Sequence, residues 1–480
     1  MQQRQGYFKR RTLILLITFL YTLVVGIVVL NRFWQFEVFY YDQGLYDRSI
    51  WLVSRLQTPI IEHQGLGRVH QFADHFIPSV FLLFSPLYWV TSRYDITLIA
   101  LSVYTGLSVL IGFEIARGLI KNRIMIYALL GAYMGYVGLQ NALIFYIHPI
   151  TAVLLPLQLL FLTLFRQQWR LFFPLLIMVL GFQETLAPLG VAIGLFMLLY
   201  RREWWKQALF VIIISLVYGY VATRIVMPSF SDKPYLYQPE WPVAREDYVK
   251  RFIDDPRKID VIQYSLATFG WLPLFAPATW PFLLQDLFLR FVVSGGPPRW
   301  DLGLHYNAPL AVLLFVSAVL GYRFLEKRRW AGTKTSVLWS LGIVGIVLYL
   351  HQFVLHGPFA LAYNPEFYRH TGRQGFMHEF LRAVPKEGVV MTQNNLAVFF
   401  THEKDVHIIN HYADILTIQP DLVVIDLRPG QNPNNFWPST EGKLREAVSF
   451  LQTNSDYTEK YNKEDRYIFV YTSKINESTP

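Results

Sequence analysis

Long apolar runs separated by short basic segments dominate the first three quarters of the chain. A helix needs about 20 apolar residues to cross the hydrocarbon core of a bilayer, and its backbone polar groups must be satisfied within the segment. The runs therefore predict an α-helical polytopic membrane protein with roughly eleven transmembrane helices. The predicted spans cover residues 12–30, 95–117, 124–140, 149–165, 170–186, 185–200, 207–227, 258–275, 277–293, 307–324 and 335–354.

The basic residues between these runs predict the orientation of the chain. Positively charged loops stay on the cytoplasmic side, so the basic cluster at residues 4–11 predicts a cytoplasmic N-terminus. With the spans above, the later basic clusters near residues 121–123, 166–170, 201–206 and 323–329 all fall on that side. We therefore expect a multi-pass protein of the plasma membrane.

The apolar stretch Phe76–Val90 needs a separate decision, because counting it as a crossing would invert the later loops and place these four clusters outside. Its internal Pro78 and Pro86 interrupt a regular helix, and we interpret the stretch as lying at the outer interface. No small-residue cleavage site follows the first span, which predicts a retained anchor. The resulting extracytoplasmic segments lie near residues 31–94, 228–257 and 294–306.

The pattern changes at His356-Gly357-Pro358, after which short apolar runs alternate with polar turns. This change predicts a transmembrane domain at residues 1–355, with a large first external loop at 31–94, and a small extracytoplasmic α/β domain at residues 356–480. Strands are predicted at 389–391, 406–409, 422–427 and 467–471, and helices at 365–384 and 441–453.

Composition supports a membrane location and argues against several classes of enzyme. Of the 480 residues, 53% are hydrophobic and only 16% are charged, whereas soluble domains carry about 25% charged residues. The formal net charge of +9 lies in short loops, so it is a topology signal and does not indicate nucleic acid as a partner.

Cysteine is absent, which excludes thiolate chemistry. The lack of a Gly-rich phosphate loop, HExxH, GxSxG and CxxC argues against a nucleotide-driven pump, a zincin or a serine hydrolase.

Ionisable residues gather near the predicted external membrane face, where unpaired polar groups in lipid are costly. Asp42 and Asp47 follow the first span, and Asp74 and His75 precede the interfacial stretch. A carboxylate at such a boundary can accept a proton from a hydroxyl group or bind a divalent cation. Asp42 and Asp47 lie about 140° apart around a helix, which makes them a weak metal pair. The alternative for each is a solvated carboxylate or a helix cap.

Further polar residues lie near the predicted outer ends of helices. Glu184 lies in an apolar run and needs a bundle cavity or a partner, while His148 fits a structural role as well as a functional one. Arg224 and Arg290 suit phosphate because guanidinium forks match its oxygens, although both side chains could instead snorkel. The pair His305-Tyr306 either lines the same pocket or belongs to the interfacial aromatic belt.

Several short motifs resemble one known family. Asp42–Trp51, His75–Pro78, Phe145–Pro149, His305–Pro309 and Val389–Leu396 resemble the domain-of-unknown-function 2079 family of prokaryotic predicted membrane proteins. The resemblance covers most of the chain. One departure is Gln183-Glu184-Thr185, where the family has Lys-Glu-Asp. Only the central glutamate is retained, so roles of the family's lysine and aspartate do not carry over.

That family is similar in plan to the clan C glycosyltransferases, which are polytopic enzymes that use lipid-phosphate-linked sugars and carry an acidic residue in the first external loop. The similarity implies that Asp42 is catalytic and that the partners are membrane lipids, a polyprenyl-phosphate sugar donor and a glycan, lipid or protein acceptor. It leaves a divalent cation open as a cofactor. If the protein is such a transferase, the ionisable residues singled out above are expected to bind the substrate, namely Asp47, Asp74, His75, His148, Glu184, Arg224, Arg290, His305 and Tyr306.

Three functions are compatible with this sequence. A glycosyltransferase is favoured because the polar residues gather at one face of the membrane. A transporter or lipid flippase usually has ionisable groups near the midplane and repeated halves with broken helices, and neither is evident. A non-enzymatic assembly or sensor protein, with an external domain that binds a partner, is the third alternative.

Overall fold

The computed structural model describes residues 2–293, 299–369, 372–385 and 388–472. The chain is mostly helical and forms two compact units, each assembled from separate segments. Unit 1 contains Met1–Val29, His75–Val80 and Leu98–Tyr363, and unit 2 contains Leu30–Asp74, Phe81–Thr97 and Asn364–Pro480.

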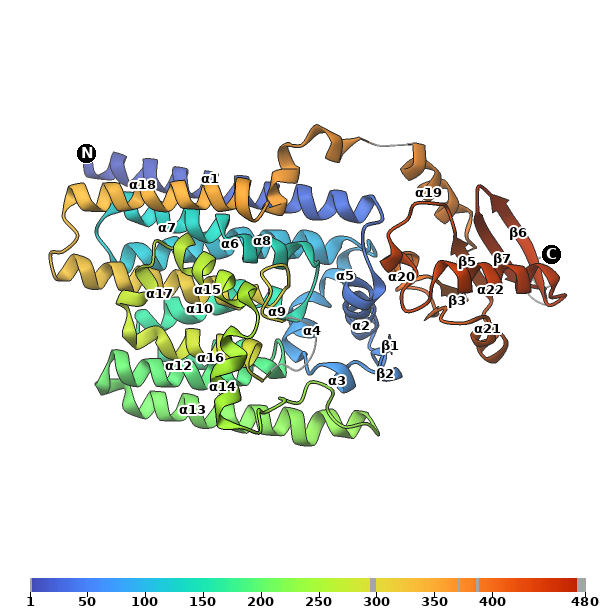
Figure 1. Cartoon of the computed structure of the whole chain (residues 1–480), viewed down its shortest axis with the longest axis horizontal. Coiled ribbons are helices and arrows are strands. Elements are labelled where there is room, and N and C mark those ends of the chain that lie inside the picture. Colours follow the sequence, from blue (N-terminus) through green and yellow to red (C-terminus); the bar gives the residue numbers. More distant parts are fainter. Residues whose placement is uncertain (1, 294–298, 370–371, 386–387, 473–480) are drawn as a thin grey trace. The chain divides into compact units, whose positions relative to one another are not determined.

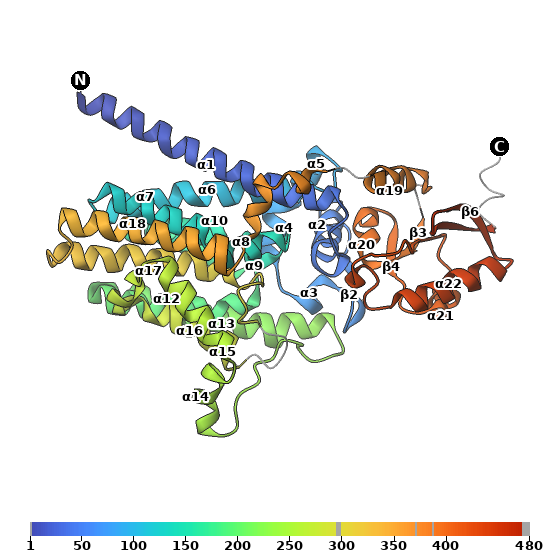
Figure 2. The ribbon, with the colours of Figure 1, turned by 45° about the horizontal axis from the view of Figure 1, so that its top comes forward.

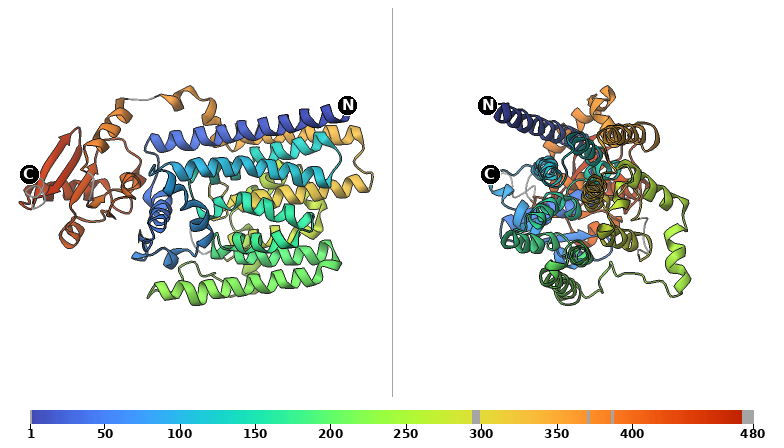
Figure 3. Two further views of the ribbon diagram at one scale, coloured as in Figure 1. Left: turned by 180° about the vertical axis from the view of Figure 1, so that it is seen from behind. Right: turned by 90° about the vertical axis from the view of Figure 1, so that its left-hand side faces the viewer.

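Unit 1 is a bundle of apolar helices, seen from the side in Figure 1 and nearly end on in the right panel of Figure 3. Among the described residues, five helices are long and apolar enough to cross a membrane. They are α1 (Gln2–Trp34), α6 (Ile96–Leu119), α13 (Trp205–Tyr220) with its flanking turns, α17 (Asn307–Lys327) and α18 (Thr333–Tyr349). Of the apolar window of α17, 89% is buried, against 17% for α18, so α17 lies at the centre of the bundle and α18 at its periphery.

The other predicted spans coincide with shorter helices, so the count of eleven is not confirmed by length. Breaks in the backbone shorten them: Tyr136 is extended between two helices, and Gly270 and Trp271 adopt left-handed φ angles of 60° and 58° inside the predicted span 258–275. The shorter helices are α7 (Arg123–Gly135), α8 (Val137–Ile144), α9 (Pro149–Ala152), α10 (Leu154–Phe165), α11 (Trp169–Leu180), α12 (Ala187–Tyr200), α15 (Pro256–Thr268) and α16 (Trp280–Phe291).

The predicted external segments contain short elements of their own. In the first, the chain forms α2 (Leu45–Ser54), an antiparallel hairpin of β1 (Ile60–His63) and β2 (Gly67–His70), and α3 (Gln71–Asp74). The stretch predicted to lie at the interface forms α4 (Pro78–Phe84) and α5 (Leu87–Val90), separated at Pro86. The second external segment contains α14 (Arg245–Ile253).

The C-terminal part of unit 2 contains a five-stranded sheet in the order β4-β3-β5-β7-β6. Strand β3 runs parallel to β4 and β5, while β7 is antiparallel to β5 and β6. Four strands match the predicted positions, namely β3 (Val389–Thr392), β4 (Asp405–Ile408), β5 (Leu422–Asp426) and β7 (Arg466–Tyr471). The edge strand β6 (Tyr457–Lys463) was not predicted, because most of its side chains are polar and only Tyr457 is buried.

Helices cover this sheet. The predicted helix at 441–453 is α22 (Glu441–Thr453), whose Leu444, Ala447, Val448 and Leu451 are buried in one core with sheet residues such as Val423. The predicted helix at 365–384 is instead a short turn at Pro365–Tyr368 and α19 (Gly372–Ala383). Two short helices, α20 (Asn394–Ala397) and α21 (Tyr412–Ile418), complete the part.

Unit 2 joins this sheet with most of the segment at residues 31–94 that was predicted to be external. The segments Leu30–Asp74 and Asn364–Pro480, which are far apart in sequence, are therefore parts of one compact body. The predicted domain boundary after residue 355 stays a prediction.

Candidate functional site

The predicted site residues divide between the two units. Asp42, Asp47 and Asp74 belong to unit 2, and the others belong to unit 1. Within each unit, some of these side chains are already hydrogen-bonded or ion-paired, and others have polar atoms that make no such contact with the described residues.

Asp42 lies in an irregular turn that connects α1 with α2. Residues Tyr40–Gly44 form one π-helical turn and continue without interruption into α2. Gly44 permits this geometry because a Cβ atom at that position would lie 2.5 Å from the ring of Tyr40. Turns of this kind are rare and occur frequently at functional sites.

The turn is held in place by Asn394 of α20. The side-chain oxygen of Asn394 accepts hydrogen bonds from the backbone N–H groups of Tyr40, at 3.0 Å, and Tyr41, at 3.3 Å. The hydroxyl of Tyr40 in turn accepts a hydrogen bond from the N–H of Glu62 in β1. Residues from the first and the last segment of unit 2 therefore hold the backbone that carries Asp42.

The carboxylate of Asp42 is half-buried and has no hydrogen-bond or ion-pair partner among the described residues. Burial raises the pKa of Asp42 from 3.8 to about 6. A carboxylate with a pKa close to neutral pH is a better proton acceptor than an ordinary one, and it is still mostly ionised at pH 7. Asp42 thus has the properties expected of a general base.

Asp47 and Asp74 differ from Asp42 because neighbours in unit 2 already engage them. Asp47 is fully buried, accepts hydrogen bonds from the Tyr88 hydroxyl and from Thr401 Oγ1 at 2.6 Å, and lies 3.0 Å from His402 Nε2. Asp74 is buried, with Gln71 Nε2 at 3.2 Å and His63 Nε2 at 3.4 Å. These contacts satisfy both carboxylates within unit 2, and the predicted role of Asp47 and Asp74 in substrate binding stays a prediction.

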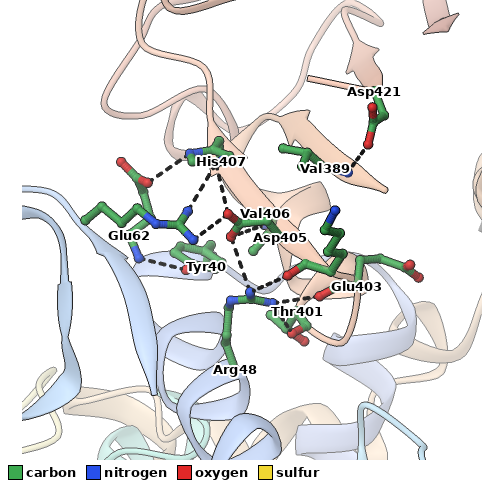
Figure 4. Close-up of polar contacts among 12 residues, drawn as sticks. Tyr40, Arg48, Glu62, Val389, Thr401, Glu403, Asp405, Val406, His407 and Asp421 are labelled. Carbon is green, nitrogen blue, oxygen red and sulfur yellow. Dashed lines mark hydrogen bonds and ion pairs between the residues drawn. The ribbon is translucent and has the colours of Figure 1, made fainter. Parts of the chain in front are cut away.

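A second group of charged side chains, shown in Figure 4, connects α2 and the β1–β2 hairpin with β4. Arg48 of α2 is buried and donates hydrogen bonds to the carbonyl groups of Thr401, Glu403 and Lys404 at 2.9–3.1 Å, and to Asp405 at 3.3 Å. Sequence reasoning missed this group, because its members come from distant segments.

In the same group, Arg68 pairs with Asp405. His407 lies between Asp405 and Glu62 (Figure 4). Burial lowers the pKa of His407, but hydrogen bonds to Asp405 and Glu62 outweigh it and raise the pKa to about 9. His407 is therefore a cation at pH 7, and the group is a scaffold of alternating charges.

In unit 1, Glu184 lies at the break between α11 and α12 and has three partners. Its carboxylate lies 2.9 Å from His75 Nδ1, and accepts hydrogen bonds from the N–H of Phe76 at 3.0 Å and from the hydroxyl of Tyr235 at 2.8 Å. The side-chain nitrogen of Gln183 lies 3.2 Å from His75 Nδ1. Glu184, which lies in an apolar run of the sequence, therefore has the polar partners that a buried carboxylate needs.

His148 and His305 form a stacked pair in the same unit, with ring centroids 3.7 Å apart. His148 caps α9, where its side chain accepts a hydrogen bond from the N–H of Ile150 and Thr151 completes the capping box. The preceding Tyr146 has a left-handed φ of 67°, and such strained residues often occur at ligand sites.

Both nitrogens of the His305 ring are buried and have no hydrogen-bond partner among the described residues. Burial lowers the pKa of His305 to about 3, with a further contribution from nearby His75, and burial also lowers the pKa of His148. Both imidazoles are therefore neutral at pH 7. A neutral imidazole offers one hydrogen-bond donor and one acceptor, and those of His305 are unused.

Aromatic rings and one arginine complete this arrangement. Tyr237 stacks on His75 with centroids 4.3 Å apart, and the guanidinium of Arg299 lies over the rings of Tyr237 at 5.5 Å and Tyr306 at 5.8 Å. We define the histidine cluster as His75, His148, Glu184, Tyr237, Arg299, His305 and Tyr306. Tyr237 and Arg299 were not predicted from the sequence, because both lie in loops without a regular pattern.

The two arginines predicted to bind phosphate are placed differently. Arg290 is buried and uses four N–H groups on the carbonyls of Arg299 and Trp300 and on the side chains of Asp286 and Asn307. Arg224 lies in the turn after α13, and its side chain is exposed. Within the described residues, no group of three or more His, Asp or Glu side chains is arranged to hold a metal ion.

Comparison with known proteins identifies the family of the chain. No curated protein matches it. The family model described as "Predicted membrane protein (DUF2079)" matches residues 32–468. This range includes the Asp42 turn and the histidine cluster. Because the match extends over most of the sequence, the chain belongs to the DUF2079 family of predicted membrane proteins.

Proposed function

We propose that this protein is a membrane glycosyltransferase that moves a sugar from a polyprenyl-phosphate-linked donor to an acceptor at the outer face of the membrane. The observation that carries the proposal is the carboxylate of Asp42, which has no partner among the described residues and a pKa of about 6. It follows the first long apolar helix in an irregular turn. The similarity in plan to clan C glycosyltransferases, which carry an acid in the first external loop, supports the same assignment.

In the proposed reaction, Asp42 acts as the general base. A hydroxyl group of the acceptor attacks the anomeric carbon of the sugar and gives its proton to the Asp42 carboxylate. The bond between the anomeric carbon and the phosphate oxygen breaks, and polyprenyl phosphate leaves with the bonding electrons. A pKa near 6 suits this step, since the base is ionised at neutral pH and retains a useful affinity for the proton.

We assign recognition of the sugar to the histidine cluster. The unused nitrogens of His305 can donate to and accept from sugar hydroxyl groups, and the stacked rings provide flat apolar faces. The donor phosphate is assigned to Arg299 or Arg224, since guanidinium groups bind phosphate oxygens well. Arg290 is a weaker choice, because most of its donors already serve the protein.

The proposal includes a topology with eleven spans, a cytoplasmic N-terminus and an extracytoplasmic C-terminal domain in the plasma membrane. The absence of cysteine makes this directly testable, because a single introduced cysteine is the only thiol. In intact cells, an impermeant thiol reagent should label Ser455→Cys but should label Thr333→Cys only after permeabilisation; both positions are exposed. The opposite pattern would refute the orientation.

The function is tested with purified protein in sealed proteoliposomes made from the host's own lipid extract. Mass spectrometry should detect loss of one lipid-linked sugar and gain of polyprenyl phosphate with the wild type and with Asp232→Asn, an exposed carboxylate that serves as a matched control. The same change should be absent with Asp42→Asn. Movement of a lipid across the bilayer without chemical change would identify a transporter or flippase instead, and Asp42→Asn turnover equal to that of the wild type would remove Asp42 from the mechanism.

A further inference from the structure

A cavity of about 1100 Å³ opens in unit 1 at the end of the bundle where α1 and α7 begin and α6 and α10 end. In Figure 2 the N-terminal part of α1 diverges from α6 and α7. The cavity is lined by Arg11, Leu13, Ile14, Leu15, Leu110, Ile111, Phe113, Glu114, Ile115, Arg117, Gly118, Leu119, Ile120, Lys121, Arg123, Ile126, Tyr127, Leu162, Phe165 and Arg166.

The inner wall of this cavity is apolar. Leucine, isoleucine and phenylalanine side chains from all four helices contribute to it. On α1, Leu13 and Leu15 are 44% and 54% exposed. These exposed side chains belong to a helix that is apolar enough to cross the membrane, so the wall is continuous with a surface suited to lipid tails.

The rim of the cavity is strongly basic. Five lining residues are basic and one, Glu114, is acidic, which leaves four net positive charges. Glu114 accepts hydrogen bonds from Arg117 at 2.6 Å and from Arg166 at 3.0 Å, so it fixes two guanidinium groups at the rim. The exposed side chains of Lys121 and Arg123 have no ion-pair partner among the described residues.

We propose that this cavity binds an anionic glycerophospholipid, with its phosphate at the basic rim and an acyl chain along the apolar wall. Charge complementarity selects the headgroup, because guanidinium and ammonium groups bind phosphate oxygens, and basic pockets between membrane helices are suited to anionic headgroups. A soluble anion would leave the apolar wall uncovered. A zwitterionic lipid would bring an ammonium group next to the basic rim.

The site is separate from the histidine cluster. His148 directly precedes α9, whereas Phe165 and Arg166 line the cavity at the far end of α10. Helices covering residues 149–165 extend over about 25 Å at 1.5 Å per residue. The inference therefore concerns a structural lipid and does not depend on the proposed transferase activity.

The test uses the purified full-length chain and native mass spectrometry with equal amounts of phosphatidylglycerol, phosphatidylcholine and polyprenyl phosphate. The wild type should retain phosphatidylglycerol at least tenfold better, and the double variant Lys121→Glu/Arg123→Glu should lose this preference. The matched control is Arg202→Glu, an exposed arginine outside the cavity lining, which should keep it. Because Arg123 begins α7, a glutamate there is compatible with the helix.

A second variant tests the role of the apolar wall independently of the basic rim. Ile111→Trp fills the cavity without altering the rim, and it should also reduce phosphatidylglycerol retention at least tenfold. Equal retention of phosphatidylglycerol and phosphatidylcholine by the wild type, or equal loss in Arg202→Glu and in the double variant, would overturn the proposal. Retention of polyprenyl phosphate in place of phosphatidylglycerol would overturn it as well, since the ligand would then be the sugar carrier.

Discussion

Replacing Arg48, which Figure 4 shows beside Asp405, with alanine should destabilise unit 2 much more than replacing Arg68. Both guanidinium groups contact Asp405. The side chain of Arg48 is only 3% exposed, whereas that of Arg68 is 44% exposed. Arg48 also donates to three carbonyl groups of the segment between α20 and β4. Its removal leaves these acceptors without their donor.

The expected magnitudes follow from this difference in burial. Leaving a buried acceptor without its donor costs about 1–3 kcal/mol. Arg48 serves three carbonyl groups, so its loss should cost about 3–5 kcal/mol in total. An exposed pair contributes about 0–1 kcal/mol. For a body of about 150–250 residues, 1 kcal/mol shifts the unfolding temperature by about 2–4 °C. Arg48→Ala should therefore lower it by about 10 °C, and Arg68→Ala by at most about 4 °C.

The assay is limited proteolysis of the purified full-length protein over a temperature series, with mass spectrometry of peptides from β3, β4 and β5. These strands report on unit 2, whereas peptides from α17 report on unit 1 and serve as an internal control. Arg48→Lys should fall between the wild type and Arg48→Ala, since lysine keeps the charge but lacks the planar fork. Equal shifts for the alanine variants of both arginines would refute the reasoning from burial.

Three further outcomes are expected. The pKa of His407 is raised from 6.5 to about 9. Its contribution to the free energy of unfolding, about 3 kcal/mol, is therefore complete below pH 6.5 and is lost as pH rises through 9. The unfolding temperature of unit 2 should fall over that range in the wild type but not in His407→Gln. The raised pKa of Asp42 means that the native state holds its proton more tightly than the unfolded state does. As pH rises from 4 to 6, the free energy of unfolding of the wild type should therefore fall by up to about 3 kcal/mol relative to that of Asp42→Asn, with no further change above pH 6. Thermal unfolding measures this difference. Gly44→Ala should cost about 1–3 kcal/mol in the same measurement, because its Cβ atom would crowd the ring of Tyr40; a neutral substitution would show that the turn is not tightly packed.

Much of the fold could be predicted, because lipid and water impose simple patterns on a sequence. Every predicted span coincides with at least one helix, and the predicted helix at Glu441–Thr453 has the predicted bounds. Strand β6 lacked the apolar alternation that identifies strands, since the edge of the sheet leaves it mostly exposed. Apolar runs also do not reveal where a helix breaks, as the left-handed Gly270 and Trp271 illustrate.

The candidate site was less accessible to prediction, because it depends on contacts between distant segments. Asp42 was predicted to be catalytic from its position after the first span, but the sequence did not show that nearby Asp47 is fully buried and hydrogen-bonded. Likewise, Arg290 was predicted to bind phosphate, and nothing in the sequence indicated that its donors serve groups within unit 1. Tyr237 and Arg299 lie in loops, where no periodic pattern indicates which side chains meet.

The central claim is that the Asp42 carboxylate is the base of a sugar transfer, and the most direct measurement is mass spectrometry of membrane lipids and glycans from cells that carry Asp42→Asn, Asp232→Asn or the wild type. With Asp42→Asn, one polyprenyl-phosphate sugar should accumulate while one glycan disappears, and the other two strains should be alike. A lipid and glycan profile for Asp42→Asn that matches the wild type would contradict the claim.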